Sequence, residues 1–228
     1  DVNLGFAGGM NIGLDYAYRQ HYQYLLLINN DTVCAADMIE TLKNCSLLDD
    51  GIFAPVIYYY DYPDQVWSVG GYLNHSLMEI EYPTIDLASK KIDKRDFLTG
   101  CALFGRTDLF KKIGFFDDTY FLYYEDRDFC MRANTLDIPL YLSYQAKLWH
   151  KVSQSSDGSD SPNERYWMGR SSIVFFRTYS KFGNMLFICF WRFGSALKTT
   201  LRLLKKKKHS SIKAYWLGLL DGFKATLK

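Results

Sequence analysis

The feature that most constrains the fold is a short, uninterrupted apolar run, YLLLI, at Tyr24–Ile28. A run without alternating polar positions is typical of a strand that is covered on both faces in a parallel sheet. It ends abruptly in four polar residues, Asn29, Asn30, Asp31 and Thr32. Polar side chains therefore follow the carboxyl end of a predicted strand, which is where open α/β sheets bind ligands.

Apolar residues at helical spacing lie on both sides of this run. Residues 11–20, after a glycine-rich turn, place Leu14, Ala17 and Tyr18 on one face, and residues 35–45 repeat the spacing. Further strands are expected at residues 52–59, 97–104 and 140–144, and further helices at residues 107–113, ending at Gly114, and 126–136. The sequence therefore predicts an α/β fold, with a mobile, lid-like loop over residues 153–162.

Charge divides the chain into two unlike parts. The net charge is only +2, yet residues 177–228 carry twelve basic residues and one acidic residue, whereas residues 1–176 carry fifteen basic and twenty-four acidic residues. We expect an acidic α/β domain over residues 1–180 and an amphipathic, basic helical tail over residues 181–228.

The tail is apolar at its start, over residues 185–191, but this stretch is shorter than the roughly 20 residues that a spanning helix needs, and Arg192 interrupts it. Aromatic residues at helical spacing, beside the lysine run 205–208, predict helices that lie on an anionic membrane surface. No nucleic-acid motif accompanies them, so no nucleic-acid partner is expected. A merely solvated charged face is the alternative.

The cysteines indicate a reduced, cytoplasmic setting. They are odd in number, widely spaced and without a Cys-x-x-Cys pair, which argues against a disulfide framework and a zinc site: Cys34, Cys45, Cys101, Cys130 and Cys189. The chain shows no secretory leader, and Asp1 opens directly onto a glycine-rich segment, so we expect a fragment boundary there.

Asn29, Asn30 and Asp31 offer hard oxygen ligands that suit Mg²⁺ or Mn²⁺. The alternative is an ordinary turn and helix cap, which the same residue types favour. His150, at the end of an apolar stretch, could supply a neutral imidazole to a metal that Asp31 also binds, or it could be a hydrogen-bonded structural residue.

The glycine-rich segment at the start of the chain contains Asn3, Gly5, Gly8, Gly9 and Asn11. Such a segment could let a phosphate approach the backbone at the N-terminus of the next helix. It matches neither a dinucleotide-binding fingerprint nor a Walker loop, and a glycine cluster can simply be a tight turn.

Glu125, Asp126 and Asp128 crowd one predicted helix start among aromatic residues. Mutual repulsion and partial burial can raise the pKa of a carboxyl towards that of a useful general base, and Asp126 is our candidate. The alternative is favourable pairing of acids with the helix dipole in the first turn.

Five motifs occur in order along the chain: NLGFAGGMNIG, YLLLINNDT, FLTGCALFGR, IGFFDDTYFLYYEDRDFCMRA and LWH. In this order the chain resembles the family-2 glycosyltransferases, particularly their rhamnosyltransferase-like branch, from about Asn3 to the region near Tyr179. The closing WLGLLDGFKA is also similar to the tail of these enzymes. The resemblance implies a GT-A fold, with a Rossmann-like, mixed and mostly parallel sheet flanked by helices. It also implies transfer of a sugar from a nucleoside-diphosphate donor with inversion at the anomeric carbon.

The resemblance assigns roles to individual residues. Asp31 would bind the divalent metal, Mg²⁺ or Mn²⁺, and His150 would complete that site. Asp126 of the Glu125-Asp126 pair would deprotonate the acceptor hydroxyl. The residues beside the donor would be Asn3, Gly5, Gly8, Gly9, Asn11, Asn29, Asn30, Thr99, Gly100 and Cys101. The acceptor would be a glycan or a lipid-linked glycan of cell-envelope polysaccharide synthesis, reached from the inner face of the membrane, and the donor a deoxysugar such as dTDP-rhamnose.

Two departures from the family pattern affect these expectations. Asn29 replaces the first acid of the Asp-x-Asp motif, and the opening strand with its nucleobase-binding residues is absent from this sequence. We therefore expect the chain as it stands to bind donor weakly. The alternative function is a non-catalytic GT-A-like subunit of a membrane glycan-assembly complex, for which nucleotide binding would not depend on metal.

Overall fold

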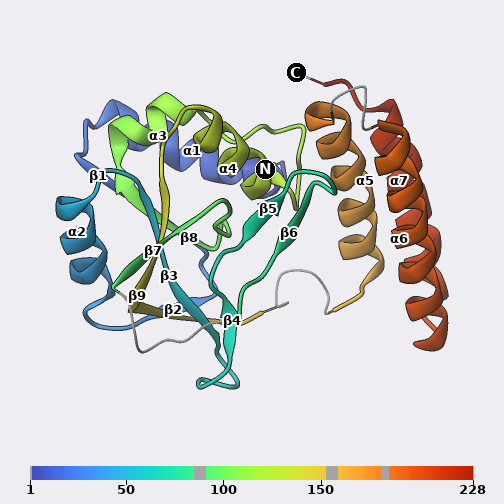
Figure 1. The fold of residues 1–228 in the computed structure, drawn as a ribbon, viewed down its shortest axis with the longest axis horizontal. Helices are drawn as coiled ribbons and strands as arrows, with labels where there is room; N and C mark the ends of the chain where they lie inside the picture. The colour runs from blue at the N-terminus through green and yellow to red at the C-terminus, as the bar shows by residue number, and fades with distance from the viewer. Residues whose placement is uncertain (1, 85–90, 153–158, 181–184, 228) are drawn as a thin grey trace.

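The computed structural model describes residues 2–84, 91–152, 159–180 and 185–227 (Figure 1). Its helices are α1 (Gly5–Arg19), α2 (Met38–Leu48), α3 (Thr107–Ile113), α4 (Glu125–Thr135), α5 (Pro162–Tyr179), α6 (Met185–Lys205) and α7 (His209–Lys224). Its strands are β1 (Tyr24–Ile28), β2 (Thr32–Cys34), β3 (Ile52–Tyr59), β4 (Val66–Ser68), β5 (Tyr72–Asn74), β6 (Glu79–Glu81), β7 (Ile92–Arg95), β8 (Ala102–Arg106) and β9 (Leu140–His150). Most of the predicted lid, residues 153–158, lies outside the described residues.

The central sheet is mixed, and its main path runs β1-β8-β3-β9-β2. β3 and β9 pair in parallel, whereas β1 and β3 are each antiparallel to β8. β1, β3 and β9 therefore point in the same direction. β2 follows the polar turn after β1 and pairs with the end of β9, so the carboxyl ends of β1 and β9 lie at the same end of the sheet and the turn between β1 and β2 connects them.

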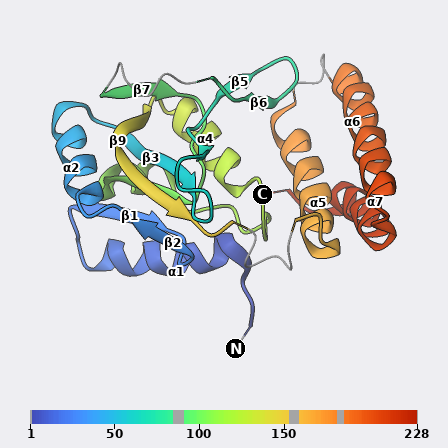
Figure 2. The same ribbon diagram turned by 90° about the horizontal axis from the view of Figure 1, so that it is seen from below.

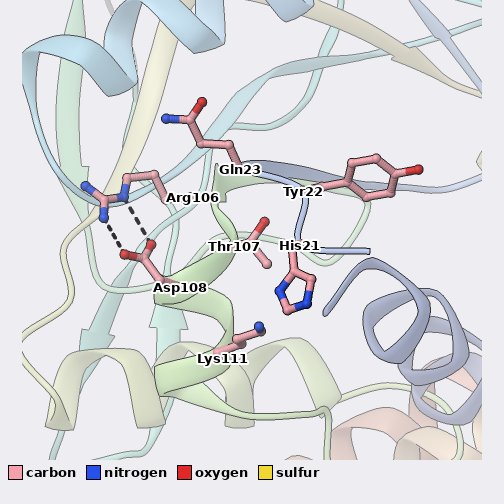
Figure 3. A pocket seen from close by; sticks show the side chains of 7 residues that line it. All are labelled: His21, Tyr22, Gln23, Arg106, Thr107, Asp108 and Lys111. Carbon is pink, nitrogen blue, oxygen red and sulfur yellow. Dashed lines mark hydrogen bonds and ion pairs between the residues drawn. The ribbon is translucent and has the colours of Figure 1, made fainter. Parts of the chain in front are cut away.

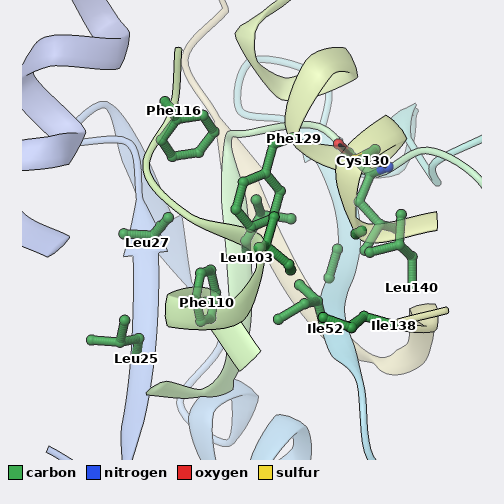
Figure 4. Close-up of a cluster of buried hydrophobic side chains, with 14 of the residues drawn as sticks. Leu25, Leu27, Ile52, Leu103, Phe110, Phe116, Phe129, Cys130, Ile138 and Leu140 are labelled. Atoms are coloured by element: carbon green, nitrogen blue, oxygen red, sulfur yellow. Dashed lines mark hydrogen bonds between the residues drawn. The ribbon is translucent and has the colours of Figure 1, made fainter. Parts of the chain in front are cut away.

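Helices cover both faces of the sheet, which explains the uninterrupted apolar run in β1. Leu25 and Leu27 face a core cluster that α1, α3 and α4 complete, with the Phe110 and Phe129 rings at its centre (Figure 4). Leu26 faces the opposite cluster, which α2 covers. The predicted α/β class, with a mixed sheet flanked by helices, is confirmed. The expectation that Tyr24–Ile28 pairs in parallel is wrong, because β1 lies at the edge of the main path and pairs with β8 in the antiparallel sense.

The glycine-rich turn predicted before residue 11 is wrong, because α1 already begins at Gly5. Gly5 has a φ of 71°, and the N–H of the next residue, Phe6, donates to the carbonyl oxygen of Phe121 at 2.8 Å. This tertiary contact starts the helix six residues earlier than its apolar spacing indicates. β9 is also longer than predicted, because the strand expected at residues 140–144 continues to His150.

The expected helical tail is present as α6 and α7, which lie with α5 at one end of the sheet (Figures 1 and 2). α5 and α7 pack with their backbones close together, because a Cβ on Gly218 would lie 2.1 Å from the carbonyl oxygen of Tyr166. Among the described residues, no helix has the length and apolar character needed to cross a bilayer.

Candidate active site

Asp31 and His150 meet at the edge of the sheet where β2 pairs with the end of β9. The register sets Thr32 opposite His150, and the N–H of Lys151 donates to the carbonyl oxygen of Asp31 at 2.9 Å. These backbone contacts bring Nε2 of His150 to 3.2 Å from Oδ1 of Asp31. The Trp67 ring packs edge-on against the imidazole, with 4.6 Å between ring centroids. Two residues 119 positions apart in the sequence therefore face each other.

This pair has the chemistry of a partial metal site. Burial lowers the pKa of His150, and the charge of Asp31 opposes this effect only in part, so the imidazole is neutral near pH 7, the form that binds metals. Three of the buried side-chain atoms that lack a hydrogen-bond partner in the described part of the chain lie at this site: Oδ1 of Asn29, Oδ1 of Asp31 and Nδ1 of His150. Carboxylate oxygen suits both Mg²⁺ and Mn²⁺, whereas an imidazole nitrogen beside it favours a transition metal such as Mn²⁺ over Mg²⁺, which prefers oxygen ligands.

The protein supplies only part of the coordination shell. Within the described ranges, no three His, Cys, Asp or Glu side chains cluster as a ready metal site. Mg²⁺ commonly binds one or two carboxylates and takes its other ligands from substrate phosphates and water. The Asp31–His150 pair therefore fits a cation that arrives with a phosphorylated ligand.

The turn before β8 connects this pair to the start of α4. The N–H of Asn29 donates to the carbonyl oxygen of Cys101 at 2.9 Å, and the N–H of Gly100 donates to Oδ2 of Asp126 at 3.1 Å. Burial raises the pKa of the Cys101 thiol far above its ordinary value, and the charges of Asp31 and Asp126 raise it further. Both carboxylates therefore lie within electrostatic reach of one buried side chain.

Asp126 differs from Asp128, two residues later, in its hydrogen bonding. Oδ2 of Asp128 accepts two bonds from the Arg132 guanidinium, at 2.9 and 2.8 Å, and Oδ1 accepts the Tyr179 hydroxyl at 2.6 Å. These partners, of which Arg132 lies one turn further along the same helix, use both oxygens of the carboxylate. Asp128 therefore fastens α4 to α5 and is not free for chemistry.

The Asp126 carboxylate is only partly occupied. Each oxygen accepts one backbone N–H, Oδ2 from Gly100 and Oδ1 from Arg127 at 2.8 Å, and burial raises the pKa of its carboxyl. Glu125 is more buried, at 6% exposure, and burial followed by the charge of Asp126 raises its pKa well above the ordinary value. Two backbone N–H bonds favour the ionised form of Asp126, whereas Oε2 of Glu125 has no partner in the described part of the chain. We therefore infer that Asp126 is the charged member of the pair, with lone pairs left to accept a proton as a general base does.

The backbone before α4 is strained. Tyr123 and Tyr124 both have positive φ, 64° and 72°, a region that non-glycine residues rarely adopt and that costs roughly 1–3 kcal/mol each. Side chains of α5 hold this segment, because the Ser171 hydroxyl donates to the carbonyl oxygen of Leu122 at 2.9 Å. Strain that the surroundings enforce directly before Glu125 is the kind that clusters at functional sites.

The start of α1 lies beside Asp126. A Cβ on Gly100 would lie 3.2 Å from the Phe6 ring and 3.3 Å from Cβ of Asp126, so these three residues are in close contact. The side chain of Asn3 accepts the N–H of Gly5 at 3.0 Å. Phe6 and Gly100 therefore lie beside Asp126, and Asn3 and Gly5 come just before Phe6 in the chain.

Other predicted donor residues lie less directly at this site. The Asn11 amide donates to and accepts from the backbone of Phe116, at 2.8 Å in each case, and so fastens a loop. Gly8 packs against Leu4, whereas a Cβ on Gly9 would meet open space. Two further residues belong to the polar turns of the site: Asn30, which is exposed, and Thr99, whose hydroxyl accepts the N–H of Cys101 at 3.4 Å.

Three residues near Asp126 were missed from the sequence: Glu79, Tyr82 and Arg127. Nη1 of Arg127 lies 3.8 Å from Oε2 of Glu79, and its guanidinium stacks over Tyr124 at 4.5 Å. Burial raises the pKa of Tyr82, and the charge of Arg127 opposes this rise. Arg127 stands within the Glu125-Asp126 motif and could have been found from it, whereas residues 61–96 carry no ordered pattern.

A separate surface pocket of about 330 Å³ lies at the opposite end of β1 (Figure 3). His21, Tyr22 and Lys111 line part of it, and its Arg106 and Asp108 side chains pair with each other. Because the predicted residues follow the other end of β1, this pocket is not part of the candidate site.

Comparison with known proteins supports the fold. No protein-family model matches the chain, and no curated protein matches it. Among solved structures, the crystal structure of GalNAc-T7 with UDP, GalNAc and Mn²⁺ is similar, with a TM-score of 0.55 and 14% sequence identity. The likeness covers 75% of this chain and 36% of that chain. The chain therefore shares the GT-A type of α/β fold over most of its length, and it spans about a third of that protein.

Proposed function

We propose that the chain is the catalytic part of a metal-dependent, inverting glycosyltransferase that uses a nucleoside-diphosphate sugar. The observation that carries the proposal is the approach of the Asp31–His150 pair and of Asp126 to the same Gly100-Cys101 turn, in a GT-A type of fold. A structure of the same fold was solved with UDP, GalNAc and Mn²⁺, which makes a diphosphate and a divalent cation suitable ligands for this arrangement.

Asp31 and His150 are the residues that would hold the cation. When bound, Mg²⁺ or Mn²⁺ would neutralise the charge that develops on the departing diphosphate. The neutral state of His150 leaves a ring nitrogen free to act as a ligand, and the edge-on Trp67 ring fixes the imidazole plane. The unpartnered amide oxygen of Asn29 would face the nucleotide.

Asp126 would act on the acceptor. The acceptor hydroxyl oxygen forms a bond to the anomeric carbon, the bond from that carbon to the diphosphate oxygen breaks, and the hydroxyl proton passes to Asp126. A single displacement of this kind inverts the anomeric configuration and needs no covalent intermediate. The bonds from Gly100 and Arg127 orient the carboxylate, and general base catalysis of this kind contributes on the order of 10²–10⁴-fold to a rate.

The finer assignment follows the order of the sequence motifs. We propose membership of family 2 in its rhamnosyltransferase-like branch, a deoxyhexose donor such as dTDP-rhamnose, and a glycan or lipid-linked acceptor of cell-envelope polysaccharide synthesis.

The α6–α7 hairpin would place the enzyme on the inner face of the cell membrane. Large apolar side chains are exposed along both helices: Phe187, Phe190, Trp191, Phe193, Leu197, Leu201, Leu204, Leu217, Leu220 and Phe223. Lys205, Lys206, Lys207 and Lys208 end α6 and connect it to α7. An exposed apolar face beside clustered lysines is the pattern of a helix that binds an anionic membrane surface.

Nucleotide binding tests the metal site directly. UDP and dTDP would be titrated into the protein by calorimetry, with Mn²⁺ and with a chelator, for the wild type and for Asp31→Asn. The proposal expects binding that requires Mn²⁺ and is lost in Asp31→Asn, while Asp37→Asn, an exposed aspartate on the neighbouring segment, binds as the wild type does. Binding that is the same without metal would favour the non-catalytic subunit.

A further inference from the structure

An apolar pocket of about 240 Å³ opens between α5, α6 and α7, away from the candidate active site. Phe176 of α5, Ala196 of α6 and Leu219 of α7 contribute to its wall. α5 and α7 are in backbone contact through glycines, whereas α6 lies against them without such close packing. The pocket is therefore the space that α6 leaves beside a tightly packed helix pair.

The mouth of the pocket lies on the exposed apolar face of the hairpin. Phe193, Leu220 and Phe223 line the pocket and are also 58%, 57% and 60% exposed. Side chains that belong both to a cavity wall and to an exposed apolar surface form a continuous path between the two. An occupant entering from that surface would be apolar and slender.

One wall of the pocket carries a cationic group with spare hydrogen-bonding capacity. Nη1 of Arg192 donates to Oε1 of Glu79 at 2.8 Å, whereas its buried Nε has no partner in the described part of the chain. The guanidinium stacks over the Phe176 ring at 4.5 Å. A guanidinium beside an apolar cavity complements an amphiphile whose anionic head is joined to a hydrocarbon chain.

Arg192 also connects the pocket to the candidate base. Glu79 bonds Arg192 with one oxygen, and its other oxygen lies 3.8 Å from Arg127, the residue after Asp126. Two ion pairs that share Glu79 therefore link Arg192 in the pocket wall to Arg127 on α4. A ligand with its chain in the pocket would have its head group on the side of the molecule that carries Asp126.

We propose that this pocket binds one hydrocarbon chain of a membrane lipid with an anionic head group. The chain lies among Phe176, Ala196 and Leu219, and the head group lies near Arg192. We further infer that this lipid is the acceptor, or the lipid part of it. That second step rests on the proposed transferase function, whereas chain binding does not.

Alkylation of Cys189 tests chain binding in the unmodified protein. Cys189 lines the pocket and is exposed, and Cys34 is exposed on β2, far from it in the fold. N-ethylmaleimide labelling of each thiol would be followed by mass spectrometry with laurate or farnesyl phosphate, below micelle-forming concentrations. Acetate and inorganic phosphate are the chain-free controls.

At a ligand concentration ten times its Kd, labelling of Cys189 should slow about tenfold, because only the free protein reacts. Labelling of Cys34 should not change, and acetate and phosphate should have no effect. Protection by only one of the two probes would identify the chain as acyl or isoprenoid. Protection by neither probe, or equal protection of Cys34, would overturn the proposal.

Two substitutions on α6 give a matched comparison. Ala196→Phe places a ring in the pocket and should abolish the protection, whereas Gly194→Phe adds the same ring where a Cβ meets open space. If Ala196→Phe fails to fold, the labelling of Cys189 in the wild-type protein still tests whether the pocket binds a hydrocarbon chain. Protection of Cys189 in a protein without transferase activity would refute the proposed function alone, and activity without protection would refute the pocket alone.

Discussion

Glu125 links the electrostatics of the candidate site to a measurable stability. Its carboxyl is buried, its Oε2 has no hydrogen-bond partner in the described part of the chain, and burial followed by the charge of Asp126 raises its pKa well above the ordinary value of about 4.3. The native state therefore keeps a proton that the unfolded chain loses as the pH rises. Stability must then fall with rising pH, from the unfolded pKa up to the raised native one.

Glu125→Gln should remove this pH dependence. Glutamine has nearly the shape of the neutral acid and does not titrate, so the free energy of unfolding of the wild type should fall relative to the variant as the pH rises. One group can contribute at most about 1.4 kcal/mol per pH unit over this window. Urea unfolding at several pH values between about 5 and 8 would measure the difference, because that window begins above the ordinary pKa of glutamate.

Glu40→Gln is the control for this experiment. It removes an exposed carboxylate on α2, whose solvation folding hardly changes, and it should keep the slope of the wild type. Parallel curves for the wild type and Glu125→Gln would refute the conclusion that Glu125 is protonated beside an ionised Asp126. Asp126 would then have to be considered as the neutral member of the pair.

Three further results are expected. His150→Ala should weaken Mn²⁺-dependent UDP binding on the order of tenfold or more, measured by calorimetry, because losing a ligand costs no less than losing a residue that orients one. Gly218→Ala should lower the free energy of unfolding by about 1–3 kcal/mol, since its Cβ would lie 2.1 Å from a backbone oxygen. Gly194→Ala on α6 should raise the free energy of unfolding by up to about 1 kcal/mol, because its Cβ would meet open space and alanine favours a helix. Urea unfolding of the two variants measures both changes. Phe190→Asp and Leu201→Asp should reduce flotation with anionic vesicles, because each removes an apolar side chain worth about 1.5–3 kcal/mol when fully buried; unchanged flotation would contradict a membrane-facing hairpin.

Much of the fold follows from local pattern. The run at Tyr24–Ile28 is apolar at every position because α1, α3 and α4 cover one face of β1 and α2 covers the other. Gly114, with a φ of 95°, ends α3 as its position after a helical segment predicts. The start of α1 could not be predicted, since the bond from Phe6 to Phe121 joins residues 115 positions apart.

Individual residues of the candidate site could be predicted from the sequence, but the contacts that distinguish their roles could not. The acids at the start of α4 could be found from the sequence, but their unequal roles could not. Asp128 is occupied by Tyr179, which lies 51 residues away, and this leaves Asp126 as the partly free carboxylate. Glu79 was missed because the pattern around it is mixed and polar, and its importance arises only from the two arginines that it contacts in space.

The central claim is that this chain carries the metal-binding and base residues of a glycosyltransferase. The most direct measurement is donor hydrolysis and sugar transfer by the longest available form of the protein, with Mn²⁺ or Mg²⁺ and a panel of UDP- and dTDP-sugars, comparing the wild type with Asp126→Asn. We expect metal-dependent release of nucleoside diphosphate and transfer to an acceptor, with transfer reduced on the order of 10²–10⁴-fold in Asp126→Asn. Transfer that survives this substitution would show that Asp126 is not the base, and the absence of turnover with every donor would contradict the enzymatic function itself.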